Sequence, residues 1–168
     1  LDEFFTRHVL HSLSIARLLR PESGSRILDV GTGGGFPGLP LAILFPSAHF
    51  TLCDSIGKKV KVVNAVAESL GLRNVEGAWA RAEALTDRPT YDFVVSRAVT
   101  KMPLFLDWVR PLIAEDQRHG LANGVLYLKG GDLTEELSTV KAPMTTWELS
   151  STLEDPFFET KKLVHVAV

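Results

Sequence analysis

A run of glycines from Gly31 to Gly35 is the part of this sequence whose residue types most directly indicate chemistry. Glycine stands at positions 31, 33, 34 and 35, directly after the apolar segment 26–30. Glycine accepts positive φ angles and lets backbone N–H groups approach a bound molecule closely. Pro37 then suits the first turn of a helix, whose N-terminus attracts a carboxylate or phosphate. The spacing predicts a ligand-binding turn between a strand and a helix.

The spacing of these glycines also separates ligand classes. A dinucleotide fingerprint that starts at Gly31 needs a third glycine at position 36, and the sequence has Phe36. S-adenosylmethionine (AdoMet) carries both a carboxylate and an ammonium group, and Asp29 is placed to face that ammonium, directly or through water. The loop is therefore interpreted as an AdoMet site, with a glycine turn that binds nothing as the alternative.

Two further features follow the next two predicted strands. Asp54 ends the second strand about 20 residues beyond the loop, where a carboxylate can accept both hydroxyl groups of a ribose. Arg81-Ala82-Glu83 follows the third strand, and the backbone amides of Ala82 and Glu83 could contact an adenine edge. Three such features in this order favour a nucleoside-containing cofactor over an empty turn.

The elements that position these residues alternate between strand and helix. Alternation of this kind predicts a mostly parallel, doubly wound α/β sheet. We expect seven strands, with an antiparallel C-terminal hairpin, as in class I (Rossmann-like) methyltransferases. The predicted strands are 26–30, 49–53, 75–80, 91–96, 124–129, 145–153 and 161–168, and the predicted helices are 4–19, 37–44, 58–70, 102–113 and 133–140.

Helical spacing also predicts which residues of two helices face the core. In the first helix these are Phe5, Val9, Leu13 and Ala16. In the helix 58–70 they are Val62, Ala65, Val66 and Ser69.

The bulk composition constrains the class of protein. The 168 residues are 45% apolar and 23% charged, which is typical of one globular domain. The single cysteine, Cys53, excludes an internal disulfide and is interpreted as a buried apolar residue. No apolar stretch reaches the length of a membrane span, and no histidine has metal-ligand spacing, so we expect neither a membrane anchor nor a metal. The net charge of −2 gives no overall basic footprint of the kind that nucleic-acid-binding proteins often carry.

Several short segments together resemble the RsmG family, also called GidB, of rRNA methyltransferases. The resemblance runs from about Phe5 to the C-terminus, and the Phe-Pro-Gly end of the loop and Ser96-Arg97-Ala98 make it specific. The segments that carry it are Asp29–Gly38, Cys53-Asp54-Ser55 with Lys58-Lys59, Arg81-Ala82-Glu83, Tyr91-Asp92 with Ser96-Arg97-Ala98, and Leu128-Lys129-Gly130-Gly131.

The resemblance implies an AdoMet-dependent enzyme that methylates N7 of a guanine in 16S ribosomal RNA. It implies a bacterial, cytoplasmic protein that binds 16S rRNA or the small ribosomal subunit, and we expect a monomer. Substrate positioning is expected from Arg97, Lys129 and Arg81. The cofactor-binding residues expected from the loop and the resemblance together are Asp29, Gly31, Gly33, Gly35, Phe36, Asp54, Ala82 and Glu83.

The N-terminal helix departs from the family pattern. The family has His-x-x-Asp-Ser-Leu there, whereas this chain reads His8-Val9-Leu10-His11-Ser12-Leu13, so histidine replaces the acid at position 11. The helices that precede this one in the family are not represented in the sequence. We expect residues 1–168 to form a single methyltransferase domain in which residues 1–20 are the N-terminal helix.

The implied chemistry needs few catalytic groups. N7 of guanine has a free lone pair and no proton to lose, so in-line attack on a sulfonium methyl group requires no general base. Positioning alone can then supply effective molarities on the order of 10⁵–10⁸ M. Arg97 is the first candidate for substrate contact, because it ends the fourth strand and a guanidinium can bind guanine or phosphate bidentately. A second interpretation of Arg97 is a structural salt bridge at a strand end.

Two other functions fit parts of the pattern. A small-molecule AdoMet methyltransferase would keep the glycine loop and Asp54 without needing Arg97. A non-catalytic nucleotide-binding or ribosome-associated module would bind AdoMet weakly or not at all. The lysines at 58, 59 and 61, with Arg7, Arg17, Arg20, Arg81 and Lys101, could form one basic face for RNA or be solvated charges.

Overall fold

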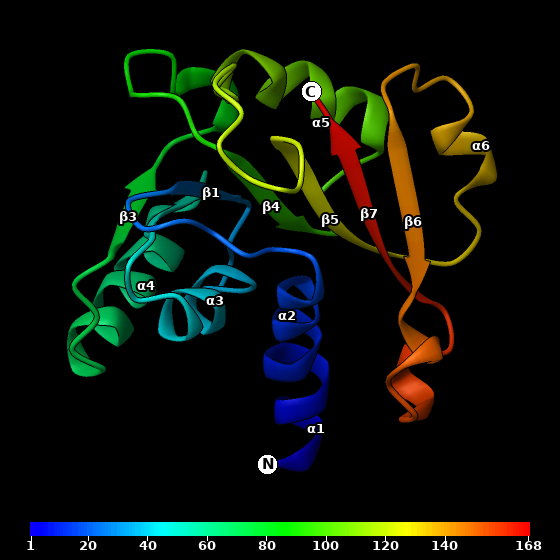
Figure 1. The fold of residues 1–168 in the computed structure, drawn as a ribbon. Helices are drawn as coiled ribbons and strands as arrows, with labels where there is room; N and C mark the ends of the chain where they lie inside the picture. Colours follow the sequence, from blue (N-terminus) through cyan, green and yellow to red (C-terminus); the bar gives the residue numbers. More distant parts are fainter.

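Seven strands form a single sheet in the order β3-β2-β1-β4-β5-β7-β6 (Figure 1). The computed structural model describes residues 1–168. β1 to β5 run parallel, whereas β7 is antiparallel to both β5 and β6. This confirms the predicted doubly wound α/β fold with its antiparallel C-terminal pair. The strands are β1 Arg26–Val30, β2 His49–Asp54, β3 Val75–Trp79, β4 Phe93–Arg97, β5 Gly124–Gly130, β6 Met144–Glu148 and β7 Lys161–Ala167.

Helices cover both faces of this sheet (Figure 1). The N-terminal helical segment, α3 and α4 lie on one face and α5 on the other, as the residues that each packs against confirm. The N-terminal segment is α1 Asp2–Phe4, a π-helical stretch Phe5–Leu10, α2 His11–Leu13 and a 3₁₀ turn Ser14–Arg17. The other helices are α3 Gly38–Leu44, α4 Gly57–Ser69, α5 Met102–Val109 and α6 Thr134–Leu137.

The core forms two layers because the side chains of a strand alternate between the faces of the sheet. On β4, Val94 packs into the layer under α5, whereas Phe93 and Val95 pack into the layer under α3 and α4. On β5, Tyr127 packs into the layer under α5 and Leu128 into the layer under α3 and α4. The two layers are each a continuous apolar cluster, so both faces of the central strands are buried.

The order of the strands reverses beside β1. From β1 the chain moves outward to β2 and β3, and then returns to place β4 on the other side of β1. Because β1 to β5 are parallel, their carboxyl ends share one edge of the sheet, the edge where open α/β sheets bind ligands. Val30, Asp54, Trp79 and Arg97 end their strands at this edge.

The predicted core face was wrong for α4 and only partly right for the N-terminal helical segment. In α4 the buried residues are Val60, Val63 and Ala67, and all four residues predicted to face the core are exposed. The helix has apolar residues on two sides, so periodicity alone could not choose between them. In and just after the N-terminal segment the buried residues are His11, Ser12, Ile15 and Leu19. Of the four predicted residues, Phe5 is exposed, whereas Val9, Leu13 and Ala16 are half-buried and Ala16 packs on the core. The π-helical stretch has more residues per turn than an α-helix, and this rotates the face that meets the core.

Several element ends also differ from the prediction. The strand predicted over 145–153 stops at Glu148, where a 3₁₀ turn begins. α5 ends at Val109 because Pro111 follows in a separate 3₁₀ turn. α6 is only four residues long. None of the helices is long and apolar enough to cross a membrane.

Candidate active site

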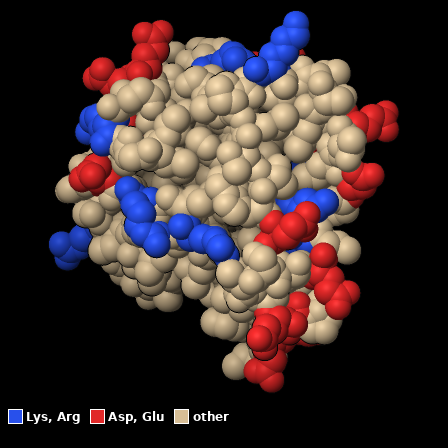
Figure 2. Space-filling model, turned by 45° about the vertical axis from the view of Figure 1, so that its right-hand side comes forward, with Lys and Arg blue, Asp and Glu red and all other residues tan.

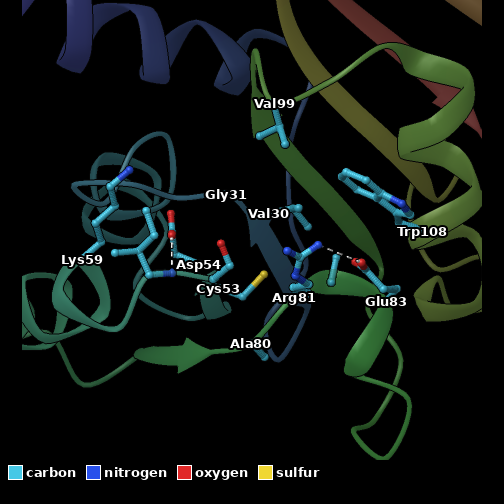
Figure 3. Close-up of a pocket in the computed structure, with 13 residues that line it drawn as sticks. Val30, Gly31, Cys53, Asp54, Lys59, Ala80, Arg81, Glu83, Val99 and Trp108 are labelled. Atoms are coloured by element: carbon cyan, nitrogen blue, oxygen red, sulfur yellow. Dashed lines mark hydrogen bonds and ion pairs between the residues drawn. The ribbon is translucent and has the colours of Figure 1, made fainter.

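A pocket of about 280 Å³ opens at the carboxyl ends of β1, β2 and β3 (Figure 3). We call it the cofactor pocket. Its walls come from the strand ends, from the turn that follows β3 and from the loop and helix that follow β4. Thirteen residues line it: Val30, Gly31, Cys53, Asp54, Ser55, Ile56, Lys59, Ala80, Arg81, Ala82, Glu83, Val99 and Trp108.

The glycine loop forms the tight turn beside this pocket. Gly31, Gly33 and Gly35 all have positive φ angles, +66°, +58° and +105°. A Cβ atom at Gly31 would lie 2.6 Å from Val99 Cγ2, and one at Gly35 would overlap Leu39 Cδ1. The loop therefore requires glycine both for its backbone angles and for its close packing.

Asp54 joins the second strand to the glycine loop. Its side chain is buried, and its Oδ2 accepts a hydrogen bond from the Gly33 amide at 2.9 Å while Oδ1 accepts one from the Ile56 amide at 2.9 Å. A carboxylate has about four lone-pair sites, so both oxygens keep capacity for a second donor. Because Asp54 lines the cofactor pocket, it can accept hydroxyl groups there without releasing the loop.

Asp29 lies behind the loop and is fully buried. Its Oδ2 accepts hydrogen bonds from the Thr32 hydroxyl at 2.7 Å and the Gly38 amide at 2.8 Å, and Oδ1 has no protein partner. This geometry holds both ends of the glycine loop. Asp29 does not line the cofactor pocket, so its predicted contact with an ammonium group stays a prediction.

The burial of Asp29 should make the stability of the unliganded protein depend on pH. Burial raises its pKa from 3.8 to about 7, against the opposing effect of its two hydrogen bonds. The folded state therefore holds a proton that the unfolded state has lost, so the free energy of unfolding should fall between about pH 4 and pH 7. Thermal unfolding of the wild type and Asp29→Asn across this range should show a smaller fall in the variant. Parallel curves would contradict this account.

The turn after β3 brings Arg81, Ala82 and Glu83 to the cofactor pocket, as expected (Figure 3). Ala82 is buried and begins a 3₁₀ turn, Ala82–Ala84. Arg81 and Glu83 form a loose, exposed ion pair at 3.9 Å. Arg81 thus lies on the cofactor side of the site, although the sequence had suggested the substrate side.

Besides Asp29, three other residues in the predicted cofactor set do not line the cofactor pocket. Gly33 contacts Asp54 through its amide, and Gly35 packs on Leu39. The Phe36 ring faces away from the cofactor pocket, and its centre lies 5.8 Å from Cζ of the Arg97 guanidinium. The pocket instead includes Ile56, Lys59, Val99 and Trp108, which the sequence reasoning did not select.

Arg97 lies at the end of β4 between the glycine loop and the N-terminal helical segment. Nη1 donates to the Arg7 carbonyl at 3.1 Å, and Nη2 contacts His8 Nδ1 at 3.2 Å. No carboxylate lies within ion-pair distance, so the structural salt bridge considered as an alternative is absent. Burial lowers the pKa of its guanidinium, partly offset by Asp29. Two of the five N–H groups are used, which leaves three for a substrate.

Lys129 has a different environment from Arg97. Its Nζ forms an ion pair with Glu136 at 3.0 Å, and the two side chains are only 10% and 16% exposed. Nζ also donates a hydrogen bond to the Thr100 carbonyl, and the Glu136 carboxylate accepts one from the Met102 amide at 2.8 Å. Tyr127 holds the loop at Val99 and Thr100, since its hydroxyl accepts hydrogen bonds from both of their amides. Lys129 therefore fixes the loop between β4 and α5, which carries Val99 into the cofactor pocket.

Removal of the Glu136 charge should destabilise this loop. Glu136→Gln leaves the Lys129 ammonium nearly buried without a counterion, which should cost about 3 kcal/mol in the free energy of unfolding. Glu135→Gln makes the same chemical change at the adjacent exposed position and serves as the control. Urea unfolding of both variants measures the difference. Equal stability of the two would show that the ion pair does not support the loop.

The remaining candidate groups have structural roles. Cys53 is buried, as predicted, and burial raises its thiol pKa to about 12. No cluster of three or more His, Cys, Asp or Glu side chains is arranged to hold a metal ion. The basic residues that could have formed one face are divided instead: Lys59 and Arg81 line the cofactor pocket, Arg7 lies beside Arg97, and Arg17 donates to Thr152 elsewhere.

Similarity to solved structures identifies the type of fold. A precorrin-6y C5,15-methyltransferase from Geobacter metallireducens superposes with a TM-score of 0.68 and 14% identity, covering 94% of this chain and 86% of that one. An rRNA methylase from Streptococcus thermophilus superposes with a TM-score of 0.64 and 12% identity over 95% of each chain. At these identities the likeness establishes a methyltransferase fold.

Sequence comparison is more specific. A protein from Flavobacterium johnsoniae named ribosomal RNA small subunit methyltransferase G is 53% identical over 99% of this chain and 78% of its own length. A protein of the same name from Cytophaga hutchinsonii is 52% identical over 99% of this chain and 79% of its own length. Residues 1–162 match the family model GidB, rRNA small subunit methyltransferase G. The chain therefore belongs to the GidB family, rRNA small subunit methyltransferase G.

Proposed function

We propose that this protein transfers the methyl group of AdoMet to N7 of a guanine in 16S ribosomal RNA. The observation that carries the proposal is the position of Arg97, a cation without a carboxylate partner, two residues before Val99, which lines the cofactor pocket. Family membership and the predicted glycine loop support the same activity. The relatives are bacterial, and ribosomal RNA as substrate would place the protein in the cytoplasm. We expect a monomer.

The residues of the cofactor pocket suit AdoMet. Asp54 has free acceptor capacity for a ribose diol, and the backbone of Ala82 and Glu83 lies at the pocket wall for an adenine edge. Val30, Ile56 and Val99 provide apolar surface. The unpaired Oδ1 of Asp29 could receive the ammonium through a water molecule. When bound, AdoMet supplies an electrophilic methyl group on a sulfonium centre.

The protein groups would then act by positioning. Arg97 would hold the guanine or an adjacent phosphate so that N7 points toward the cofactor pocket, and Lys129 would keep the loop with Val99 in place. Arg81, being mostly exposed, would contact RNA at the rim of the cofactor pocket. N7 has no proton to lose, so no side chain is required as a base.

The charge distribution is compatible with an RNA substrate in spite of the net charge of −2. Figure 2 shows one face on which a short band of adjoining Lys and Arg side chains crosses a largely uncharged surface, whereas the charged groups at the lower edge are mostly acidic. Phosphate contacts need only such a local patch.

The partition of a labelled methyl group tests this proposal against the small-molecule alternative. The protein would be incubated with labelled AdoMet, with small ribosomal subunits that lack N7-methylguanine, and separately with a low-molecular-weight metabolite fraction. We expect label in RNA only. Label in metabolites with none in RNA would replace this proposal by the small-molecule activity, and failure to bind AdoMet at all would favour a non-catalytic module.

A further inference from the structure

A second pocket lies next to the cofactor pocket, on the side of the N-terminal helical segment. We call it the basic pocket; its volume is about 370 Å³. No acidic residue is among those that line it. Its charged and titratable residues are Arg7, His8, His11, Arg97, Lys129 and Lys161.

Two of the four Lys and Arg side chains in the basic pocket have no carboxylate partner. Lys129 pairs with Glu136, and Arg7 pairs with Glu3 at the exposed surface. Arg97 and Lys161 have no carboxylate within 4.0 Å, the limit of an ion pair. Lys161 lies 4.9 Å from the centre of the Phe157 ring, and neither side chain is fully solvated. Two partly buried cations facing one space without counterions favour the binding of an anion.

His11 is an independent sign of a missing ligand. It is only 5% exposed, it lines the basic pocket, and neither ring nitrogen has a hydrogen-bond partner. Its ring is held edge-on by Phe157 and Phe158, at 5.3 Å and 5.9 Å between centroids. Burial, and then Arg97 and Lys161, lower its pKa to about 4. The imidazole is therefore neutral at pH 7. Its single N–H has no acceptor at hydrogen-bond geometry, although the Arg7 backbone lies near enough to oppose the fall in pKa.

The basic pocket is connected to the cofactor pocket through consecutive residues. Arg97 and Ala98 line the basic pocket, and Val99 lines the cofactor pocket. Ala98 has a φ of +47°, an unusual backbone angle that turns the chain from one pocket to the other. Arg7 and His8 come from the π-helical stretch, a conformation frequent at functional sites.

We propose that the basic pocket binds a backbone phosphate of the RNA beside the target guanine. The guanidinium of Arg97 and the ammonium of Lys161 would supply charge, and the neutral ring of His11 would donate one hydrogen bond. A phosphodiester group can accept from all three donors at once, because its two free oxygens offer several lone pairs. The identity of RNA as the source of the phosphate rests on the proposed function, whereas the preference for an anion rests on the pocket itself.

Binding of unmethylated 16S rRNA transcript without AdoMet tests this site apart from catalysis. Lys161→Gln should weaken binding roughly tenfold and lower the slope of log affinity against log salt by about 0.7–0.9. Lys161→Arg should restore both values. Lys141→Gln is the matched control, since this exposed lysine lies near the opposite end of β7. If Lys161→Gln binds RNA as Lys141→Gln does, the proposal is wrong, even if methyl transfer to RNA is observed.

His11 can report the occupant directly by nuclear magnetic resonance. A short RNA oligonucleotide should raise the pKa of the His11 ring, because an anion favours the imidazolium, and Lys161→Gln should reduce that rise. Inorganic phosphate at millimolar concentration should have little effect. A saturable response to inorganic phosphate, with RNA affinity unchanged in Lys161→Gln, would overturn the assignment to an RNA phosphate. Should RNA bind as expected and no methyl group be transferred, the proposed function alone would fail.

Discussion

Arg97→Ala is expected to lower kcat/KM for ribosomal RNA by about 100-fold while AdoMet binding stays at the wild-type strength. The guanidinium has three N–H groups free for substrate, and a bidentate charged contact contributes up to about 3 kcal/mol, about 100-fold in rate or affinity. Arg97 does not line the cofactor pocket, so the AdoMet affinity should not change. Steady-state methyl transfer and calorimetric titration with AdoMet measure the two effects.

Arg73→Ala is the matched control for this variant. Arg73 is exposed and precedes β3, so it lies at the opposite edge of the sheet from Arg97. We expect this control to have wild-type kcat/KM and AdoMet affinity. Normal methyl transfer by Arg97→Ala would remove Arg97 from the substrate side of the site.

Asp54→Ala should weaken AdoMet binding by at least about 100-fold. The variant would lose two charge-assisted hydrogen bonds to a ribose, each worth about 1.5–3 kcal/mol, and it would free the Gly33 amide that shapes the loop. Asp54→Asn should fall between the wild type and Asp54→Ala, since its amide oxygen can replace only one acceptor. Calorimetric titration with AdoMet in the absence of RNA isolates this effect from substrate binding.

Asp107→Ala removes a carboxylate from the exposed surface of α5 and controls for the change of net charge. Its AdoMet affinity should equal that of the wild type. If Asp54→Ala binds AdoMet as tightly as this control does, the cofactor lies elsewhere or does not contact this carboxylate.

The sheet could be predicted because its signals are local. β1 matches the predicted strand 26–30, and β2 exceeds its predicted range only by Asp54. Each predicted strand is a short, mostly apolar run followed at once by a residue needed at the carboxyl edge, Gly31 after 26–30 and Asp54 after 49–53. The parallel order then brings Asp54 and Ala82 to one pocket, as expected from their positions after β2 and β3.

Features that depend on tertiary contacts could not be predicted. Trp108 was not among the site residues predicted from the sequence, and it reaches the cofactor pocket only because α5 packs over β4. The partner of Lys129 is Glu136, whose approach depends on the path of the chain after β5. The burial of His11 depends on Phe157 and Phe158, which are nearly 150 residues further along the chain.

Identification of the methylated nucleoside tests the central claim most directly. Small ribosomal subunits that lack N7-methylguanine would be incubated with the protein and labelled AdoMet, and the RNA would be digested to nucleosides and separated. The account predicts that all label in the 16S RNA is 7-methylguanosine. Label in another nucleoside, or at another atom of guanosine, would contradict transfer to N7 without a general base.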